Sequence, residues 1–171
     1  MATRFTRKAQ KVLNLSMQIA SELGHTYIGS EHLLLGLLSE DTGVAAHYLQ
    51  ERGATVEKVQ EAVVRIAGEG TPSAISSSDI TPRTKNIIEN SLVESQRYGQ
   101  NYIGTEHLLL ALLEERDCVA VRVLETLGVS VNDLRQDIVA FLNNAGSGEA
   151  EFSGSRGGFG GAPAGRQQAG K

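Results

Sequence analysis

The sequence lacks several features that mark other classes of protein. It contains one cysteine, Cys118, so no disulfide can form within the chain. No apolar run approaches the roughly 18 residues that a helix needs to cross a bilayer. The formal charge of −4 is small and acidic, which argues against a nucleic-acid binder. We therefore predict a protein of a reducing compartment, the cytoplasm, that binds neither nucleic acid nor membrane.

One segment of the sequence occurs twice. The run 27–38 (YIGSEHLLLGLL) returns as 102–113 (YIGTEHLLLALL), identical at ten of twelve positions with an offset of 75 residues. The same register pairs Gly24 with Gly99. A copy of about 65 residues is marginal by itself, because it buries only roughly 60% of its unfolded surface. The two copies are predicted to form one domain over 3–144, and a site on one copy should have a twin on the other.

Helical spacing of apolar residues is readable within each copy. From Phe5 to Leu23 apolar residues recur every three or four positions, and Gly24 ends the pattern. Ser30 and Thr105 are predicted to cap short, Leu-rich helices at the centre of each unit. The other predicted helices, bounded by capping residues and glycines, cover 43–52, 55–67, 81–98, 118–127 and 130–143. The sequence thus predicts an all-α domain of eight helices.

Two stretches lack helical periodicity. Residues 69–79 are rich in Gly and Ser and are predicted to be an exposed connector between repeat one (3–68) and repeat two (80–144). From 145 onward Gly, Ser, Ala, Pro and Gln dominate, and such a composition buries too little apolar surface to offset its ordering entropy. Residues 145–171 are therefore predicted to be a disordered, flexible linker.

The start of each Leu-rich helix carries the most informative chemistry. Ser30-Glu31 and Thr105-Glu106 place a hydroxyl and a carboxylate beside unpaired backbone N–H groups at a positive helix end. Such a site suits a ligand that carries both signs of charge, provided that the carboxylates are reachable from water. Alternatively, the hydroxyl only caps the helix and the glutamate only complements its dipole, each contributing about 1 kcal/mol or less.

Patterns for catalysis and metal binding are missing. We find no set of nucleophile, base and orienting acid, so this chain is predicted not to be an enzyme. His32 and His107 follow glutamates, but the second histidine of the H-E-x-x-H zinc motif is absent. We predict no metal site and interpret both as structural histidines that bond to a nearby carbonyl. His25 has Gln100 as its counterpart, which indicates no repeated site at that position.

Several of these motifs together resemble a known family. The duplicated G-[ST]-E-H-L-L-L block, the opening Arg4-Phe5-Thr6, the start of copy two at 81–83 (TPR) and the Gly-rich exit resemble the N-terminal repeat domain of Clp-type AAA+ unfoldases, nearest the ClpC type. The resemblance covers residues 3–144. It implies two pseudo-twofold-related four-helix repeats, flexibly attached to a hexameric ATPase ring that feeds substrates to a ClpP-type peptidase.

The resemblance also implies partners and a ligand. In the ClpC type this domain docks adaptor proteins and, in some bacteria, recognises phosphorylated arginine as a degradation mark at two pockets. Carried over by motif, the acidic residues of these pockets are Glu31 and Glu106, while Ser30, Thr105 and nearby backbone amides would receive the phosphoryl oxygens. No cofactor is implied for this chain, because ATP and magnesium belong to the ATPase modules of that family. The isolated domain is expected to be a monomer.

Three interpretations remain open from the sequence. The first is a domain that recruits substrates and adaptors for a proteolytic unfoldase. The second is a stand-alone Clp-repeat adaptor or accessory protein of the Clp protease, which the coding sequence downstream of Lys171 would distinguish. The third is a hydrolase of arginine phosphate that uses the paired carboxylates, although these lie in separate copies without an obvious partner base. Release of phosphate from phosphoarginine would support it.

Overall fold

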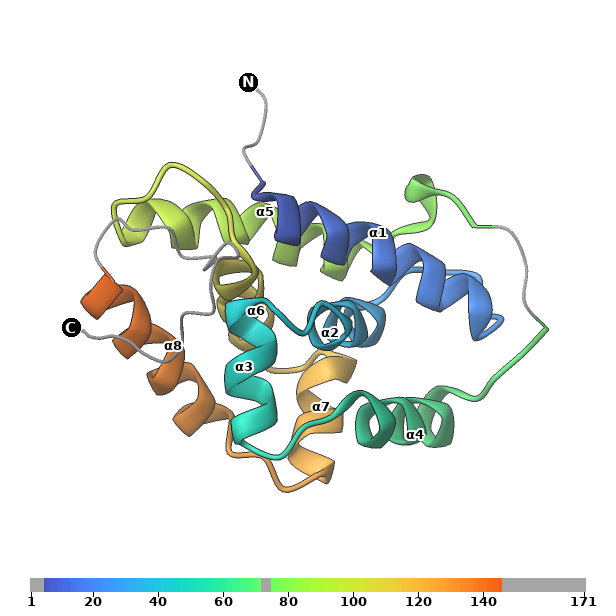
Figure 1. Cartoon of the computed structure of the whole chain (residues 1–171). Coiled ribbons are helices and arrows are strands. Elements are labelled where there is room, and N and C mark those ends of the chain that lie inside the picture. The colour runs from blue at the N-terminus through green and yellow to red at the C-terminus, as the bar shows by residue number, and fades with distance from the viewer. Residues whose placement is uncertain (1–4, 72–74, 146–171) are drawn as a thin grey trace.

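The computed structural model describes residues 5–71 and 75–145, and within these ranges the chain forms eight α-helices and one short 3₁₀ helix (Figure 1). The predicted all-α class is confirmed. Of the predicted linker 145–171, Ala145 ends the last helix, and residues 146–171 lie outside the described residues. Among the described helices none has the length and apolar character that a bilayer span requires. The elements are α1 (Arg7–Glu22), α2 (Ser30–Ser39), α3 (Val44–Glu51), α4 (Val56–Ala67), η1 (Ser77–Asp79), α5 (Pro82–Arg97), α6 (Thr105–Glu114), α7 (Val119–Thr126) and α8 (Val131–Ala145).

The ends of most helices follow the capping signals in the sequence. The side chains of Thr6, Thr55 and Thr81 each accept a hydrogen bond from the backbone N–H three residues on, at the starts of α1, α4 and α5. Pro82 occupies the first turn of α5, where its missing N–H has no helical partner to lose. Local chemistry therefore sets these boundaries. The 3₁₀ turn η1 inside the connector was not predicted.

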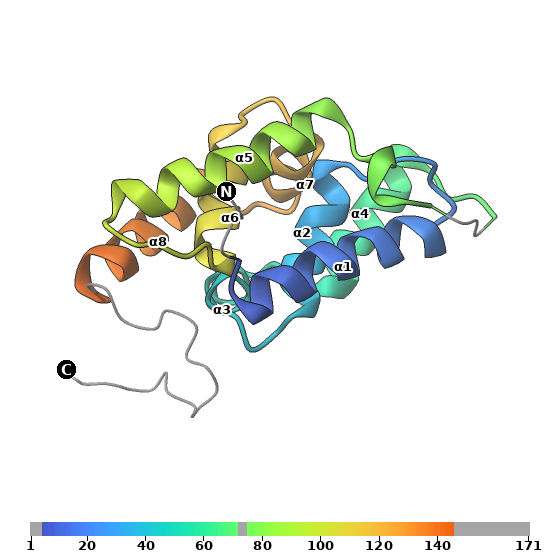
Figure 2. The same ribbon diagram turned by 90° about the horizontal axis from the view of Figure 1, so that it is seen from above.

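The Leu-rich helices α2 and α6 lie at the centre of the domain (Figure 1). Every residue of 30–38 and of 105–113 is buried, as their apolar sequences predict. Helix α1 packs on α2 and helix α5 packs on α6, so that α1 and α5 run along the same face (Figure 2). Helices α3, α4, α7 and α8 cover the opposite side. The central pair is thus enclosed by the other six helices.

Contacts between the two repeats occur in symmetric pairs. Phe5 forms a bridge with Ile103, and Ile28 forms a bridge with Ile80; the 75-residue register converts the first pair into the second. In the same way α2 packs on α7 and α6 packs on α3. The two repeats are therefore related by a pseudo-twofold axis. The axis lies next to α2 and α6, which are equivalent helices in contact with each other. Each repeat completes its core with helices of the other.

The first turns of α3 and α7 are capped from the opposite repeat. The Thr105 hydroxyl accepts a hydrogen bond from the backbone N–H of Ala45 in α3 (3.2 Å), and the Ser30 hydroxyl accepts one from Ala120 in α7 (3.1 Å). The N-cap residues of α3 and α7 themselves supply no side-chain cap. Both hydroxyls are buried, so these reciprocal bonds fasten the two repeats together.

Thr105→Val should destabilise the domain, because valine keeps the side-chain shape but leaves the buried Ala45 N–H without an acceptor. We expect the free energy of unfolding to fall by roughly 1–3 kcal/mol, measured by urea denaturation. The control is Thr126→Val at the exposed end of α7, which should change stability by less than about 0.5 kcal/mol. Equal losses in the two variants would contradict the capping role.

Candidate functional site

Helices α2 and α6 begin in an unexpected way. Their N-cap residues are Gly29 and Gly104, so Ser30 and Thr105 lie inside the first turn and the prediction that they cap their own helices is wrong. The backbone N–H of each glycine donates to Nδ1 of the histidine three residues on, at 2.8 Å for His32 and 2.9 Å for His107. The histidine thus takes the place that Glu or Gln holds in a capping box, which leaves the hydroxyl free to bond across the repeat boundary.

Both predicted acidic residues are buried. Glu31 is 2% exposed and Glu106 is 0% exposed. The expectation that the carboxylates are open to water is therefore wrong for this conformation. Each carboxylate folds back over the preceding glycine: a methyl group added to Gly29 or Gly104 would lie 2.6 Å from Oε1 of Glu31 or Glu106, respectively. Glycine at the N-cap makes room for the carboxylate beside the positive end of the helix.

A tyrosine holds the first carboxylate. The Tyr27 hydroxyl donates a hydrogen bond to Oε2 of Glu31 at 2.9 Å. Burial, the Glu31 charge and this hydrogen bond together raise the pKa of Tyr27 to about 12, so that the phenol remains a donor at neutral pH. The Tyr27 ring stacks parallel on His25, with centroids 5.4 Å apart, and lies 5.2 Å from the ring of His32. The tyrosine is therefore held in place by rings as well as by its hydroxyl.

Both repeats contribute to the pocket beside Glu31. It has a volume of about 170 Å³ and brings Tyr27 and Glu31 of repeat one together with Arg83 of repeat two. The remaining lining residues are Gly29, Ser30, Thr81, Thr84 and Val119. The start of α5 is held there by backbone bonds on both sides of Ile28, from Thr81 N–H to its carbonyl and from its N–H to the Asp79 carbonyl, each 3.0 Å. A carboxylate and a guanidinium thus border one small pocket.

The sequence predicted that each site lies within one repeat, and it did not reveal that both repeats line the pocket beside Glu31. Residues 81–84 lie about fifty positions beyond Glu31 along the chain, yet they form the other wall of its pocket. The register assigns Lys8 as the counterpart of Arg83, so a basic residue stands at that place in both repeats. The bond from Thr6 N–H to the Ile103 carbonyl (2.9 Å) likewise joins the start of α1 to the segment that precedes Glu106.

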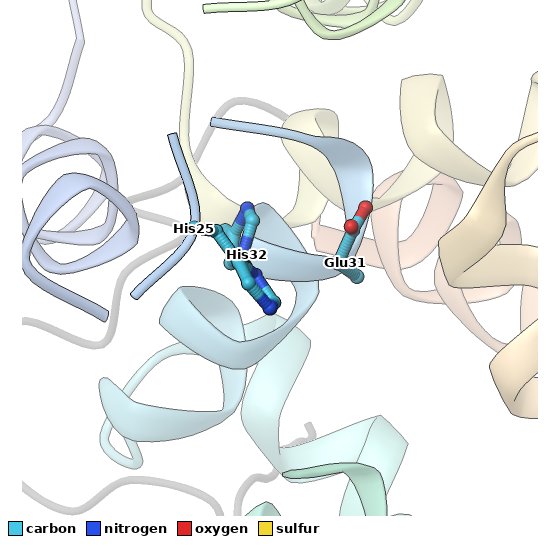
Figure 3. Close-up of side chains that lie close together, drawn as sticks. All are labelled: His25, Glu31 and His32. Atoms are coloured by element: carbon cyan, nitrogen blue, oxygen red, sulfur yellow. Dashed lines mark hydrogen bonds between the residues drawn. The ribbon is translucent and has the colours of Figure 1, made fainter. Parts of the chain in front are cut away.

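His32 is part of a chain of hydrogen bonds. Because its Nδ1 accepts from Gly29, the neutral ring carries its proton on Nε2, which faces Nδ1 of His25 at 2.7 Å. His25 then donates from Nε2 to the Gly68 carbonyl at 2.8 Å. Figure 3 shows the two imidazoles together, with the Glu31 carboxylate leaving the helix on another side. The ligand atoms of His25, Glu31 and His32 are close enough together to bind one metal ion. However, all four ring nitrogens of the two histidines already take part in hydrogen bonds.

In the second repeat the corresponding histidine also bonds to a side chain, but to that of a different residue. Nε2 of His107 faces the side-chain oxygen of Gln100, the counterpart of His25. Positions 25 and 100 therefore make the same structural contact with different side chains. The interpretation that each histidine bonds to a nearby carbonyl is confirmed for His107, which meets the amide oxygen of Gln100, and is wrong for His32, whose partner is the ring of His25. The shared position in the register was the signal that could have revealed the pairing.

A second depression lies between α1 and α5. Its volume is about 220 Å³, and its apolar lining comes from both helices and from the core beneath them: Leu13, Met17, Ile28, Leu33, Ile80 and Ile88. Gln10, Asn14 and Thr84 complete its rim. An apolar groove with a flexible methionine in its wall suits apolar side chains of varied shape.

The fold and the two depressions described above define a class of protein, a helical tandem-repeat domain whose surface is suited to binding. The chain belongs to the Clp repeat (R) N-terminal domain family, whose model matches residues 4–120 and 79–154. It is 47% identical over 148 residues to the chaperone protein ClpB of Oceanobacillus iheyensis and 46% identical over 149 residues to the negative regulator of genetic competence ClpC/MecB of Bacillus subtilis. Each match covers 86% of this chain but 18% of the relative, so the chain spans about a fifth of their length.

Solved structures agree with this assignment. The N-terminal domain of the chaperone ClpD from Arabidopsis thaliana aligns with a TM-score of 0.69 and 31% identity, covering 81% of this chain and 97% of that one. A complex of the ClpV N-domain with a VipB peptide aligns with a TM-score of 0.62 over 82% of this chain and 88% of that one. At 16% identity the second likeness concerns the fold alone.

The buried histidines should make stability depend on pH. Burial, with the nearby His25, lowers the pKa of His32 to about 3, and burial lowers that of His107 to about 4. Both rings are neutral in the folded protein, whereas the unfolded chain takes up protons below about pH 6.5. Their stabilising contribution is therefore complete above pH 6.5 and declines as the pH falls toward 4, on the order of 1.4 kcal/mol per pH unit for each ring.

Urea denaturation between pH 5 and 6.5 measures this slope. In His107→Gln the glutamine can still accept from the Gly104 N–H, as in a capping box, and the slope should fall by about half. A free energy of unfolding that stays constant over this range in the unmodified chain would contradict the assignment of neutral, buried rings.

Proposed function

We propose that this chain recruits polypeptides for a Clp-type unfoldase and that its pockets at Glu31 and Glu106 bind phosphorylated arginine. The observation that carries the proposal is the first pocket, where a buried carboxylate and a basic guanidinium face one volume of about 170 Å³. Phosphoarginine has a cationic guanidinium joined to an anionic phosphoryl group. A pocket of this size is below the range of drug-sized sites and fits the end of one side chain.

Our proposal assigns the phosphoryl group to other residues than the sequence suggested. Ser30 and Thr105 are buried and cap helices of the opposite repeat, so in our proposal they position the walls of the pockets. The guanidinium group of the ligand binds Glu31, and its phosphoryl group binds Arg83, whose side chain is about half exposed and lies 3.8 Å from Glu115. Charge-assisted bonds of this kind are roughly twice as strong as neutral ones. In our proposal the 75-residue register gives the corresponding roles in the other repeat to Glu106 and Lys8.

Isothermal titration with phosphoarginine tests the pockets. The unmodified chain should bind two equivalents, and Glu31→Gln or Glu106→Gln should each lose one of them, with affinity at the altered pocket reduced more than about tenfold. Arg83→Gln should weaken phosphoarginine at the first pocket but leave free arginine unaffected, since only the phosphoryl contact is lost. Equal heats from the unmodified chain and both glutamine variants would exclude the two pockets.

We assign the docking of partner proteins to the apolar groove between α1 and α5. Its occupant in this proposal is an apolar peptide segment of a substrate or adaptor, as the peptide complex of the related ClpV N-domain suggests. The groove lies between α1 and α5, so a segment bound in it would touch both repeats. These two helices run along one face of the domain (Figure 2). Leu13 and Met17 would supply much of the contact surface on the α1 side.

Met17→Glu should weaken binding of a fluorescently labelled, unfolded casein several-fold, because it places a charge in the apolar groove. Fluorescence anisotropy measures the affinity. Gln18→Glu is the matched control, since it adds the same charge one residue further on at an exposed position outside the groove. Equal affinities of the two variants would assign casein to another surface.

The wider setting is part of the same proposal. Because the chain spans about a fifth of the length of its relatives, we propose that it works as the N-terminal part of a longer ATP-dependent unfoldase that supplies a ClpP-type peptidase. The alternative is a separate adaptor protein of that protease. Mass determination of the protein in its native cells distinguishes a product of about this length from one several times longer.

A further inference from the structure

The Glu31 carboxylate is buried, and one of its oxygens is held by a hydrogen bond. Oε2 accepts the Tyr27 hydroxyl at 2.9 Å, and Oε1 lies so close over Gly29 that an added methyl group would be 2.6 Å away. The residue is 2% exposed, although it lines the pocket. A guanidinium binds a carboxylate best through two parallel N–H bonds, one to each oxygen. In this conformation Tyr27 therefore occupies a position that such a ligand needs.

We propose that Tyr27 is a latch on the first pocket: its hydroxyl holds Glu31 closed and has to release Oε2 before a guanidinium group can bind both oxygens. The inference rests on the proposed function for the identity of the ligand. Tyr27 is suited to this role because it lines the pocket beside Glu31 and is only partly buried. The latch makes the pocket selective for ligands, because a cation that binds Glu31 only weakly does not offset the loss of the hydrogen bond from Tyr27 to Glu31.

The substitution Tyr27→Phe removes the hydroxyl and keeps the ring, so it tests the hydrogen bond to Glu31 separately from the packing of the ring. In Tyr27→Phe the ring keeps its neighbours His25 and His32, whose centroids lie 5.4 and 5.2 Å away, so the local packing is preserved. The carboxylate loses its donor and becomes available to solvent and ligand. A residue with only a structural role would lower affinity when altered, whereas release of a competing hydrogen bond raises it.

Two measurements test the latch. The first is labelling of Glu31 by a water-soluble carbodiimide with glycine ethyl ester, followed by peptide mass spectrometry, which needs no ligand. The second is titration with phosphoarginine in a Glu106→Gln background, which isolates the first pocket. Tyr27→Phe should increase labelling and tighten binding roughly three- to tenfold. Tyr48→Phe is the control, because Tyr48 lies on α3 with its ring against Phe141, and it should change neither quantity.

The outcomes distinguish the latch from the proposed function. Unchanged labelling of Glu31 in Tyr27→Phe overturns the latch whatever the ligand. If Tyr27→Phe increases labelling but leaves phosphoarginine binding unchanged or weaker, the hydrogen bond of Tyr27 does not limit affinity and the latch is overturned. Phosphoarginine then still binds at the first pocket, so the proposed function stands. Increased labelling without binding in any variant supports the latch and overturns phosphoarginine as the ligand.

Discussion

Two central helices without an exposed face govern the architecture of this domain. Because α2 and α6 are buried on all sides, they are in contact with both repeats, and their first residues can meet the ends of helices from the opposite half. Ser30 and Thr105 do so by capping α7 and α3. The buried N–H groups at those helix starts need acceptors that their own N-cap residues do not provide. Neither repeat is complete without the other.

The burial of the first turn of α2 also buries the carboxylate of Glu31, which costs free energy. Glu31 is buried at the start of a leucine-rich helix, and burial of a carboxylate is unfavourable unless donors and a positive potential surround it. The helix end and the Tyr27 hydroxyl offset part of this cost. An apolar residue would serve a purely structural role in such a core at a lower cost. A buried carboxylate beside a pocket with Arg83 on its rim is therefore the main physical argument for a binding site.

The two halves share a plan but differ in detail. His25 in the first repeat and Gln100 in the second hold the corresponding histidines, so only the first half contains a histidine pair. Gly36 packs so closely on α1 that a methyl group would lie 2.8 Å from the Val12 carbonyl, whereas the second repeat has Ala111 at this position. Such differences follow when two copies keep their register and repack locally, so the surroundings of Glu31 and Glu106 are similar but not identical.

The sequence by itself determined the duplication, the eight helices, most of their boundaries and the positions of the acidic residues, because helical periodicity, capping threonines and terminal glycines act over a few neighbouring residues. Only the tertiary structure decided what Ser30 and Thr105 cap, that Glu31 and Glu106 are buried, and that Arg83 completes the first pocket. These features depend on contacts such as those between residues 60 and 90 positions apart in the sequence. Periodicity identifies the buried face of a helix, but packing across the pseudo-twofold axis decides which repeat covers it.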